Sequence, residues 1–190
     1  MVYTGDFTTY HGSKQYNQLQ DVMTEVVQGK LGTVGIFGNH DYGHQWCHQE
    51  VADRKQQICK DAGIRILRNQ YTNIEGLNVI GIDDYWGTNF NPKAIMPRGD
   101  WNEANLVLCH NPDVMDLDVW NGYGDWVLAG HTHGGQVKPP FLDPPFLPFM
   151  NKRYTSGAFN FDDGRKLYIN RALGNVLHIR FNARPEITVF

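Results

Sequence analysis

The segment Leu128-Ala-Gly-His-Thr-His-Gly-Gly-Gln136 places two histidines directly after a short apolar run. His131 and His133 are separated by one residue and lie between glycines. An apolar run of four to eight residues is typical of a buried strand, and imidazole nitrogens are common ligands of transition metals. The segment therefore predicts a metal site on the loop that leaves a buried strand.

Three further segments repeat this arrangement elsewhere in the chain. They are Gly5-Asp6, Gly38-Asn39-His40-Asp41 and Cys109-His110-Asn111, and each follows an apolar run. Asp, Asn and His are the ligand types that hold hard or borderline metal ions. In open α/β sheets, ligands bind at the carboxyl ends of the strands. We therefore expect these strand ends to meet in one site.

Length and composition indicate one folded α/β domain over residues 1–190. The 190 residues are 41% hydrophobic and 19% charged, which is ordinary for a globular protein with a substantial core. The net charge of -3 disfavours a nucleic-acid partner. Cys47, Cys59 and Cys109 form no paired motif and are interpreted as free thiols. Neither a signal peptide nor an apolar stretch of membrane-spanning length is apparent.

In their order and spacing, these motifs resemble the calcineurin-like metallophosphoesterase superfamily. The tail, with Lys152-Arg153-Tyr154, Tyr168-Ile169-Asn170-Arg171 and Asn182-Ala183-Arg184-Pro185-Glu186, resembles its bacterial YaeI/YkuE-like phosphodiesterase branch. The resemblance implies a four-layer α/β/β/α sandwich of two mixed sheets. It also implies metal-dependent hydrolysis of a phosphoester, most often a diester, by a metal-activated water at a binuclear site.

The same resemblance assigns roles to individual residues. Asp6 would bridge two divalent ions (Mn, Fe or Zn), and Asn39, His110 and His131 would complete the site of one of them. His133 would join Asp6 at the other ion. His40 would contact the phosphate as a general acid or an electrostatic stabiliser, and Asp41 would orient His40 by accepting its other ring proton.

One family motif has no counterpart here. The family opens with a D-x-H motif on a strand upstream of its Gly-Asp motif, whereas only five residues precede Asp6. We therefore expect a sandwich that is incomplete at its N-terminal edge, a truncated gene or partial sequence, and an impaired second metal site. Such a chain would bind one ion tightly and be a poor enzyme.

Each motif also has an ordinary structural interpretation. Asp6 and Asn39 could be turn residues, His110 could be a loop histidine, and His131 and His133 could flank a glycine turn. Four such coincidences in the family order are less probable than one site. The alternative function is a non-catalytic module that binds a metal or a partner. Tyr85 and Trp86 near the expected mouth could pack in the core or stack on a substrate.

Hydrophobic periodicity and turn residues predict the remaining elements. Helices are expected over residues 13–28, 46–62 and 112–120. Strands are expected over residues 1–5, 33–37, 64–67, 71–74, 77–82, 106–109 and 126–129. Residues 83–103 read as irregular, and the last stretch reads as a β-meander with a hairpin turn at Asp162-Asp163-Gly164.

Residues 139–150 form a proline-rich segment that can be neither a helix nor a central strand. Its apolar side chains are Phe141, Leu142, Phe146, Leu147 and Phe149. Two interpretations remain open for them. They pack on the domain, or they form an exposed patch for an amphiphilic or lipid-linked substrate and for peripheral membrane contact.

Overall fold

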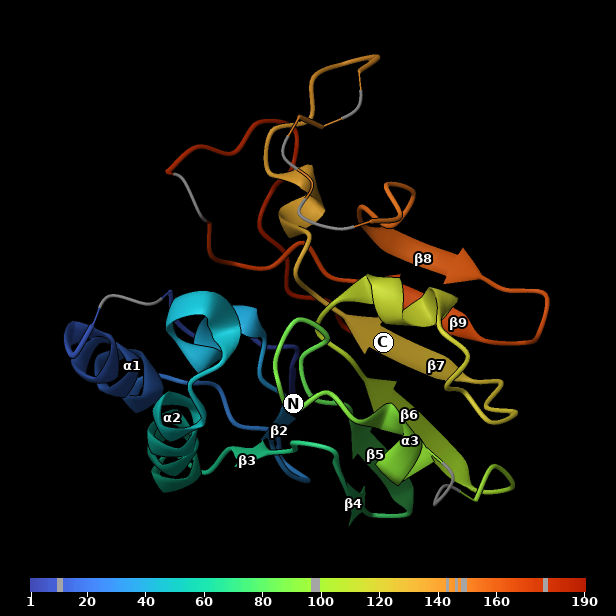
Figure 1. Cartoon of the computed structure of the whole chain (residues 1–190), viewed down its shortest axis with the longest axis horizontal. Helices are drawn as coiled ribbons and strands as arrows, with labels where there is room; N and C mark the ends of the chain where they lie inside the picture. The colour runs from blue at the N-terminus through green and yellow to red at the C-terminus, as the bar shows by residue number, and fades with distance from the viewer. Residues whose placement is uncertain (10–11, 97–99, 143, 146, 148–149, 176–177) are drawn as a thin grey trace.

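The computed structural model describes residues 1–190 except 10–11, 97–99, 143, 146, 148–149 and 176–177. It contains a three-stranded sheet and a six-stranded sheet, with helices on the outer side of each (Figure 1). The expected α/β sandwich of two packed sheets is thereby confirmed.

The smaller sheet is parallel and has the order β1-β2-β3. Its strands are β1 (Val2–Tyr3), β2 (Val34–Gly35) and β3 (Arg65–Ile66). Helices α1 (Lys14–Thr24) and α2 (Gln49–Asp61) lie beside it (Figure 1). The short helices η1 (Asn39–Tyr42) and η2 (His44–Trp46) follow β2. Because β1 and β2 run the same way, Asp6 and Asn39 leave the same end of the sheet.

The larger sheet is mixed and has the order β4-β5-β6-β7-β9-β8. Its strands are β4 (Gln70–Ile74), β5 (Leu77–Gly81), β6 (Ala104–Leu108), β7 (Trp126–Ala129), β8 (Gly157–Asn160) and β9 (Lys166–Ile169). Strands β5, β6, β7 and β9 are parallel to one another, whereas β4 and β8 pair antiparallel at the two edges. The carboxyl ends of the four central strands therefore form one rim.

Three clusters of buried apolar side chains hold the layers of the sandwich together. The first, with Leu19 and Phe37, lies between the helices and the small sheet. The second, with Ile36 and Leu108, lies between the two sheets. The third, with Val107 and Met115, joins the large sheet to α3 (Pro92–Ile95) and η4 (Pro112–Asp116). Val107 and Leu108 pack on opposite faces, as the two-residue period of a strand requires.

Several expected helices are shorter in the structure. The first ends at Thr24 instead of residue 28, and the second begins at Gln49 instead of residue 46. Gln45 and Trp46 have φ angles of 54° and 58°, which no right-handed helix accepts. In place of the expected helix over residues 112–120, the structure has the 3-10 helix η4 (Pro112–Asp116). The Asn111 side chain caps this helix by accepting a hydrogen bond from the backbone N–H of Asp113.

The expected C-terminal meander is reduced to the hairpin β8–β9. The hairpin turns at Asp162-Asp163-Gly164 as expected, and the φ of 92° at Gly164 suits a glycine. Beyond Ile169, the only sheet-like pairing among the described residues is a bridge between Val137 and Phe181. None of the helices that the structure describes is long and apolar enough to cross a membrane.

Candidate metal centre

The side chains of Asp6, His110 and His131 meet where β1, β6 and β7 end. Nε2 of His110 lies 3.0 Å from Oδ2 of Asp6 and 3.2 Å from Nδ1 of His131. One ligand atom from each residue lies within 4.8 Å of the other two. Metal–ligand bonds of about 2.1 Å put adjacent ligand atoms about 3 Å apart. These three side chains therefore have the spacing that one divalent ion needs.

Asn39 offers a side-chain oxygen as a candidate fourth ligand atom. Its side chain is 1% exposed, and its Oδ1 has no hydrogen-bond partner among the described residues. The next residue, His40, donates its backbone N–H to Oδ1 of Asp6 at 3.0 Å. This hydrogen bond places the backbone of Asn39 and His40 next to the Asp6 carboxylate. A buried carbonyl oxygen without a partner costs about 1–3 kcal/mol, and a cation would supply the missing interaction.

The orientation of His110 suits ligation through Nε2. Its Nδ1 lies 2.6 Å from the carbonyl oxygen of Thr4. A carbonyl oxygen can only accept, so Nδ1 carries the proton and donates it. The Nε2 atom, which faces Asp6 and His131, would then be the ligand atom. A backbone carbonyl that fixes the tautomer of a histidine ligand is a common second-shell arrangement.

Charges at the site are mutually stabilising. Burial lowers the pKa of His110, but the adjacent Asp6 carboxylate outweighs it and raises that pKa to about 9. Burial likewise raises the pKa of Asp6, but His110 outweighs it and holds the pKa of this carboxyl well below its usual range. A metal ion would replace the proton of His110 as the positive partner of Asp6, because histidine ligates in its neutral form.

The backbone at this site is strained and crowded. Asp6 and His131 have φ angles of 58° and 68°, a region that non-glycine residues rarely adopt. Such conformations cluster at functional sites, where the surrounding structure holds them in place. A Cβ added at Gly38 would lie 2.3 Å from Oδ1 of Asp6 and 2.6 Å from Nε2 of His110. Only glycine lets the β2 loop approach these ligands so closely.

Asp41 has a different set of partners from the one expected. Its buried carboxylate accepts hydrogen bonds from the backbone N–H groups of Asp6 (2.8 Å), Phe7 (3.1 Å) and Gly38 (3.0 Å). In the described part of the chain it makes no hydrogen bond to the His40 ring, and the orienting role expected for it stays a prediction. Asp41 joins the loop after β1 to the loop after β2, and so positions Asp6 and Asn39.

Lys55 supports Asp41 and was not identified from the sequence. Its ammonium group lies 3.5 Å from Oδ1 of Asp41 and donates to the backbone oxygen of His40 at 3.1 Å. Both side chains of this ion pair are fully buried. Lys55 shares the inward face of α2 with Val51, Ala52 and Cys59. A lysine at helical spacing among apolar residues was the available signal.

His40 and His133 lie outside the three-residue cluster. His40 is half-buried, and its contact with the site is made by its backbone N–H. His133 has a φ of 52°, and its Nδ1 lies 3.5 Å from the guanidinium of Arg180. Burial lowers the pKa of His133, and Arg180 lowers it further. A neutral His133 remains able to ligate a metal through its other nitrogen.

Asp84 is a further residue of the site that sequence reasoning did not assign, and Trp86, for which packing and substrate stacking were both open, lies beside the site. Asp84 is 1% exposed; burial raises its pKa to about 7, His110 opposes the increase and Asp6 adds to it. The ring of Trp86 contacts the ring of His131, with centroids 4.5 Å apart. The signal was present, since Ile82-Asp83-Asp84 also places an acid directly after an apolar strand.

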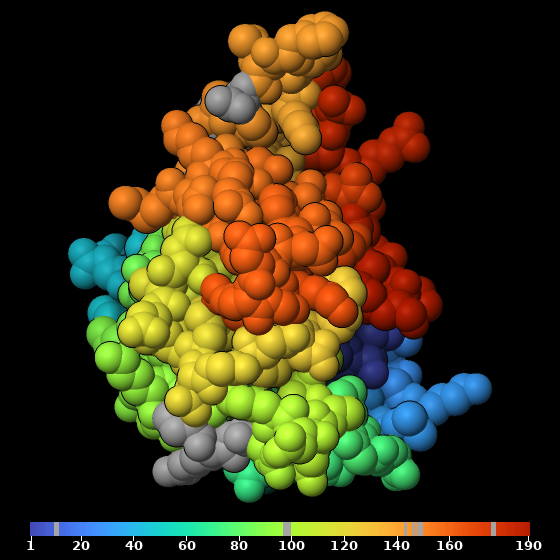
Figure 2. Space-filling model, turned by 90° about the vertical axis from the view of Figure 1, so that its right-hand side faces the viewer, coloured from blue at the N-terminus to red at the C-terminus, as the bar shows by residue number. Residues whose placement is uncertain are grey.

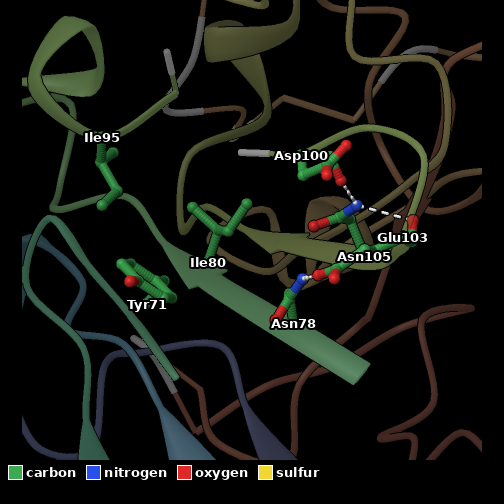
Figure 3. Close-up of a pocket in the computed structure, with 7 residues that line it drawn as sticks. All are labelled: Tyr71, Asn78, Ile80, Ile95, Asp100, Glu103 and Asn105. Carbon is green, nitrogen blue, oxygen red and sulfur yellow. Dashed lines mark hydrogen bonds between the residues drawn. The ribbon is translucent and has the colours of Figure 1, made fainter. Parts of the chain in front are cut away.

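A separate pocket of about 170 Å³ lies near the opposite ends of β5 and β6. It is lined by Tyr71, Asn78, Ile80, Ile95, Asp100, Glu103 and Asn105 (Figure 3). Its acidic residue Glu103 precedes the first residue of β6, whereas His110 follows the last. The metal-ligand cluster and this pocket therefore belong to different ends of the same strands.

Comparison with curated proteins finds relatives over nearly the whole chain. The chain is 34% identical to the phosphodiesterase YaeI of Escherichia coli over 97% of its length. It is 30% identical to the metallophosphoesterase YkuE of Bacillus subtilis over 100% of its length. It is 25% identical to the UDP-2,3-diacylglucosamine pyrophosphatase LpxG of Chlamydia muridarum, also over 100%. No protein-family model matches the chain.

The relatives are longer than this chain. It spans 67% of YaeI, 66% of YkuE and 72% of LpxG.

Substitution of Gly38 by alanine should disrupt the metal-ligand cluster. The added Cβ would force the β2 loop away from Asp6 and His110, and overpacking of this kind costs about 1–3 kcal/mol. For a protein of this size we expect the melting temperature to fall by about 2–4 °C per kcal/mol, together with a loss of Mn²⁺ affinity. Calorimetry measures both. Gly174→Ala is the matched control, because a Cβ there meets nothing within 4 Å; equal behaviour of the two variants would contradict the prediction.

Lys55→Met should destabilise the chain by leaving the Asp41 carboxylate buried without a cation. Removing one partner of a buried ion pair typically costs about 3–5 kcal/mol. Urea denaturation followed by circular dichroism measures the loss. Lys60→Met is the control, since Lys60 is an exposed lysine on the same helix. A change below about 1 kcal/mol, the value of a surface pair, would contradict the role given to Lys55.

Proposed function

We propose that this chain, which belongs to the metallophosphoesterase family, hydrolyses a phosphodiester with the help of bound divalent metal ions. One observation carries the proposal. Ligand atoms of Asp6, His110 and His131 lie within 4.8 Å of one another, at the joined ends of two sheets. The unpartnered Oδ1 of Asn39 beside them supports the same proposal. These residues fit Mn, Fe or Zn and do not select among the three.

The proposed mechanism assigns each residue a physical task. A bound ion would polarise the phosphoryl group and lower the pKa of a water. Asp6, Asn39, His110 and His131 would hold that ion, with Asp6 as the only anionic ligand. Because the other three are neutral, the site keeps a net positive charge that attracts an anionic ester. His133 would contribute to a second, weaker ion, so we expect one tightly bound ion per chain.

His40 is the proposed group for the phosphate and the leaving group. Its backbone is anchored to Asp6, and its ring forms no hydrogen bond with the described residues. The ring is therefore available to a substrate. It would stabilise the developing charge or donate a proton to the departing oxygen.

The substrate that we propose is amphiphilic, with a lipid-linked phosphoester. Two chain segments, residues 138–153 and 171–184, are joined where the backbone N–H of Lys138 donates to the oxygen of Phe181. They project together from the end of the molecule beyond η5 (His133–Gly135) (Figures 1 and 2). Among their described residues, these segments expose the large apolar side chains of Phe141, Leu142, Met150, Leu173, Ile179 and Phe181.

The two segments, called the apolar tip below, also carry a strong charge bias. They contain six basic residues and one acidic residue. Exposed apolar side chains with a basic rim match the surface of an anionic lipid layer.

The part of segment 138–153 around Leu147 packs on the domain, because Leu147 contacts the apolar core of the large sheet. Phe146 and Phe149, for which the same alternatives were open, lie outside the described residues. The name of the relative LpxG, a pyrophosphatase of a diacylated sugar nucleotide, supports this substrate class.

His40→Ala separates chemistry from metal binding. We expect turnover of bis(p-nitrophenyl) phosphate with Mn²⁺ to fall about 10²–10⁴-fold, the usual effect of removing a general acid. The metal content, measured by elemental analysis, should stay at the wild-type value. His44→Ala, at an exposed histidine of the neighbouring η2, is the control. Parallel loss of metal and activity would make His40 a ligand. A wild-type chain that binds Mn²⁺ but hydrolyses no diester would favour the alternative, a non-catalytic metal-binding module.

Replacing Phe141 and Leu142 by serine should weaken binding to phosphatidylglycerol vesicles and leave binding to phosphatidylcholine vesicles low. Turnover of the small soluble diester should not change, because the tip side chains are exposed and do not contact the ligand cluster. Vesicle co-sedimentation measures the effect. Leu31→Ser, at an exposed leucine in the connection between α1 and β2, is the matched control. Unchanged co-sedimentation of the double variant would contradict a lipid-binding tip.

A further inference from the structure

Asp84 stands at the rim of the candidate metal centre. It follows β5, which pairs in parallel with β6, and the two strands stay joined beyond their ends where Ile82 donates its N–H to Leu108 O at 2.9 Å. Strand β6 then delivers His110 and strand β5 delivers Asp84. Asp84 therefore lies at the same carboxyl-terminal rim of the large sheet as His110. Its strand, β5, is two strands away from β7, which precedes His131.

The tandem acids Asp83 and Asp84 have opposite environments. The Asp83 carboxylate accepts hydrogen bonds from Tyr42 and Asn89 and lies 3.7 Å from the guanidinium of Arg68. Asp84 uses one oxygen only, which accepts the backbone N–H of Trp86 at 2.9 Å. Its other oxygen, Oδ1, is buried and has no hydrogen-bond partner in the described part of the chain. A buried carboxylate in this state needs a positive charge or a donor nearby.

The Trp86 loop connects Asp84 to a metal ligand. The indole of Trp86 meets the His131 ring edge-on, at 87° and 4.5 Å between centroids. On the same indole, Trp46 stacks at 4.8 Å with an interplanar angle of 26°. Trp86 is thus held between Trp46 and His131 while its backbone is fixed by Asp84. The His131 backbone has a strained φ of 68°, a conformation that the surrounding structure must hold in place.

We propose that Asp84 is a positioning residue that tightens divalent-cation binding at the Asp6–His110–His131 cluster. One carboxylate oxygen fixes Trp86 against His131, and the other adds a buried negative charge behind the ligands. Asp84 is not itself one of the three clustered ligands. It acts on the ion through His131 and through charge. The inference rests on the proposed function only in requiring that the cluster bind a metal.

The test measures Mn²⁺ affinity of the whole chain by isothermal titration calorimetry, without substrate. Asp84→Asn keeps an acceptor for the Trp86 amide and removes the charge. We expect its Mn²⁺ dissociation constant to rise about tenfold or more, as for other residues behind metal ligands. Its melting temperature without metal should equal that of the wild type, because a buried charge has been replaced by a neutral isostere. A purely structural role would instead lower the melting temperature and leave the affinity unchanged.

Variants of Trp86 test the packing of its ring on His131 and do not depend on the folding of Asp84→Asn. Trp86→Ala removes the ring that packs on His131 and should weaken Mn²⁺ binding, whereas Trp86→Phe keeps an aromatic edge there and should bind close to the wild-type value. Tryptophan fluorescence of the wild type should also change on titration, since Trp86 touches His131.

Glu103→Gln is the matched control. It removes the same charge at the opposite end of β6, so the Mn²⁺ affinity should not change. Equal affinity of folded Asp84→Asn and the wild type would overturn the inference and leave the proposed function intact. Equal affinity of Trp86→Ala and the wild type would overturn the positioning role in the same way. Failure of the wild type itself to bind Mn²⁺ would overturn the proposed function and this inference with it.

Discussion

The buried carboxylate of Asp41 is the interaction on which the rest of the site depends. It accepts the amides of Asp6, Phe7 and Gly38, and so ties the loop after β1 to the loop after β2. Lys55 balances its charge from α2. Without this carboxylate the amides would be unsatisfied in the interior, and the strained Asp6 backbone would have no support. Asp41 therefore positions Asp6, the first candidate ligand, through backbone hydrogen bonds.

The candidate ligands come from two sheets, and one contact brings these sheets together at the rim. His110 of the large sheet donates to the carbonyl of Thr4, which follows β1 of the small sheet. The same imidazole reaches Asp6 and His131 through its other nitrogen. One ring thus joins the two layers and sets the spacing of the ligand atoms. This arrangement explains why the motifs lie far apart in sequence and always follow strands.

Much of this organisation could be predicted from the sequence, because strands and ligands leave strong local patterns. Apolar runs that end in Asp6, Asn39, His110 and His131 indicated the strand ends, and the family resemblance supplied the sandwich. Other features depend on tertiary contacts that no local pattern records. Asp41 and Lys55 are paired only because α2 packs on the small sheet. Trp46 was expected to begin a helix, but its stacking on Trp86 accompanies a left-handed backbone that excludes one.

The hydrogen bond between Thr4 and His110 closes a loop of 106 residues. Contacts of such sequence separation form late in folding, after the entropy of closing the loop has been offset by packing. The ligand cluster can therefore exist only in a chain whose two sheets are already assembled. Metal binding and global folding would then be thermodynamically linked, and an ion at 100 times its dissociation constant would stabilise the native state by about 2.7 kcal/mol. The ion would then connect the two sheets, and the metal concentration would affect the free energy of unfolding of the chain.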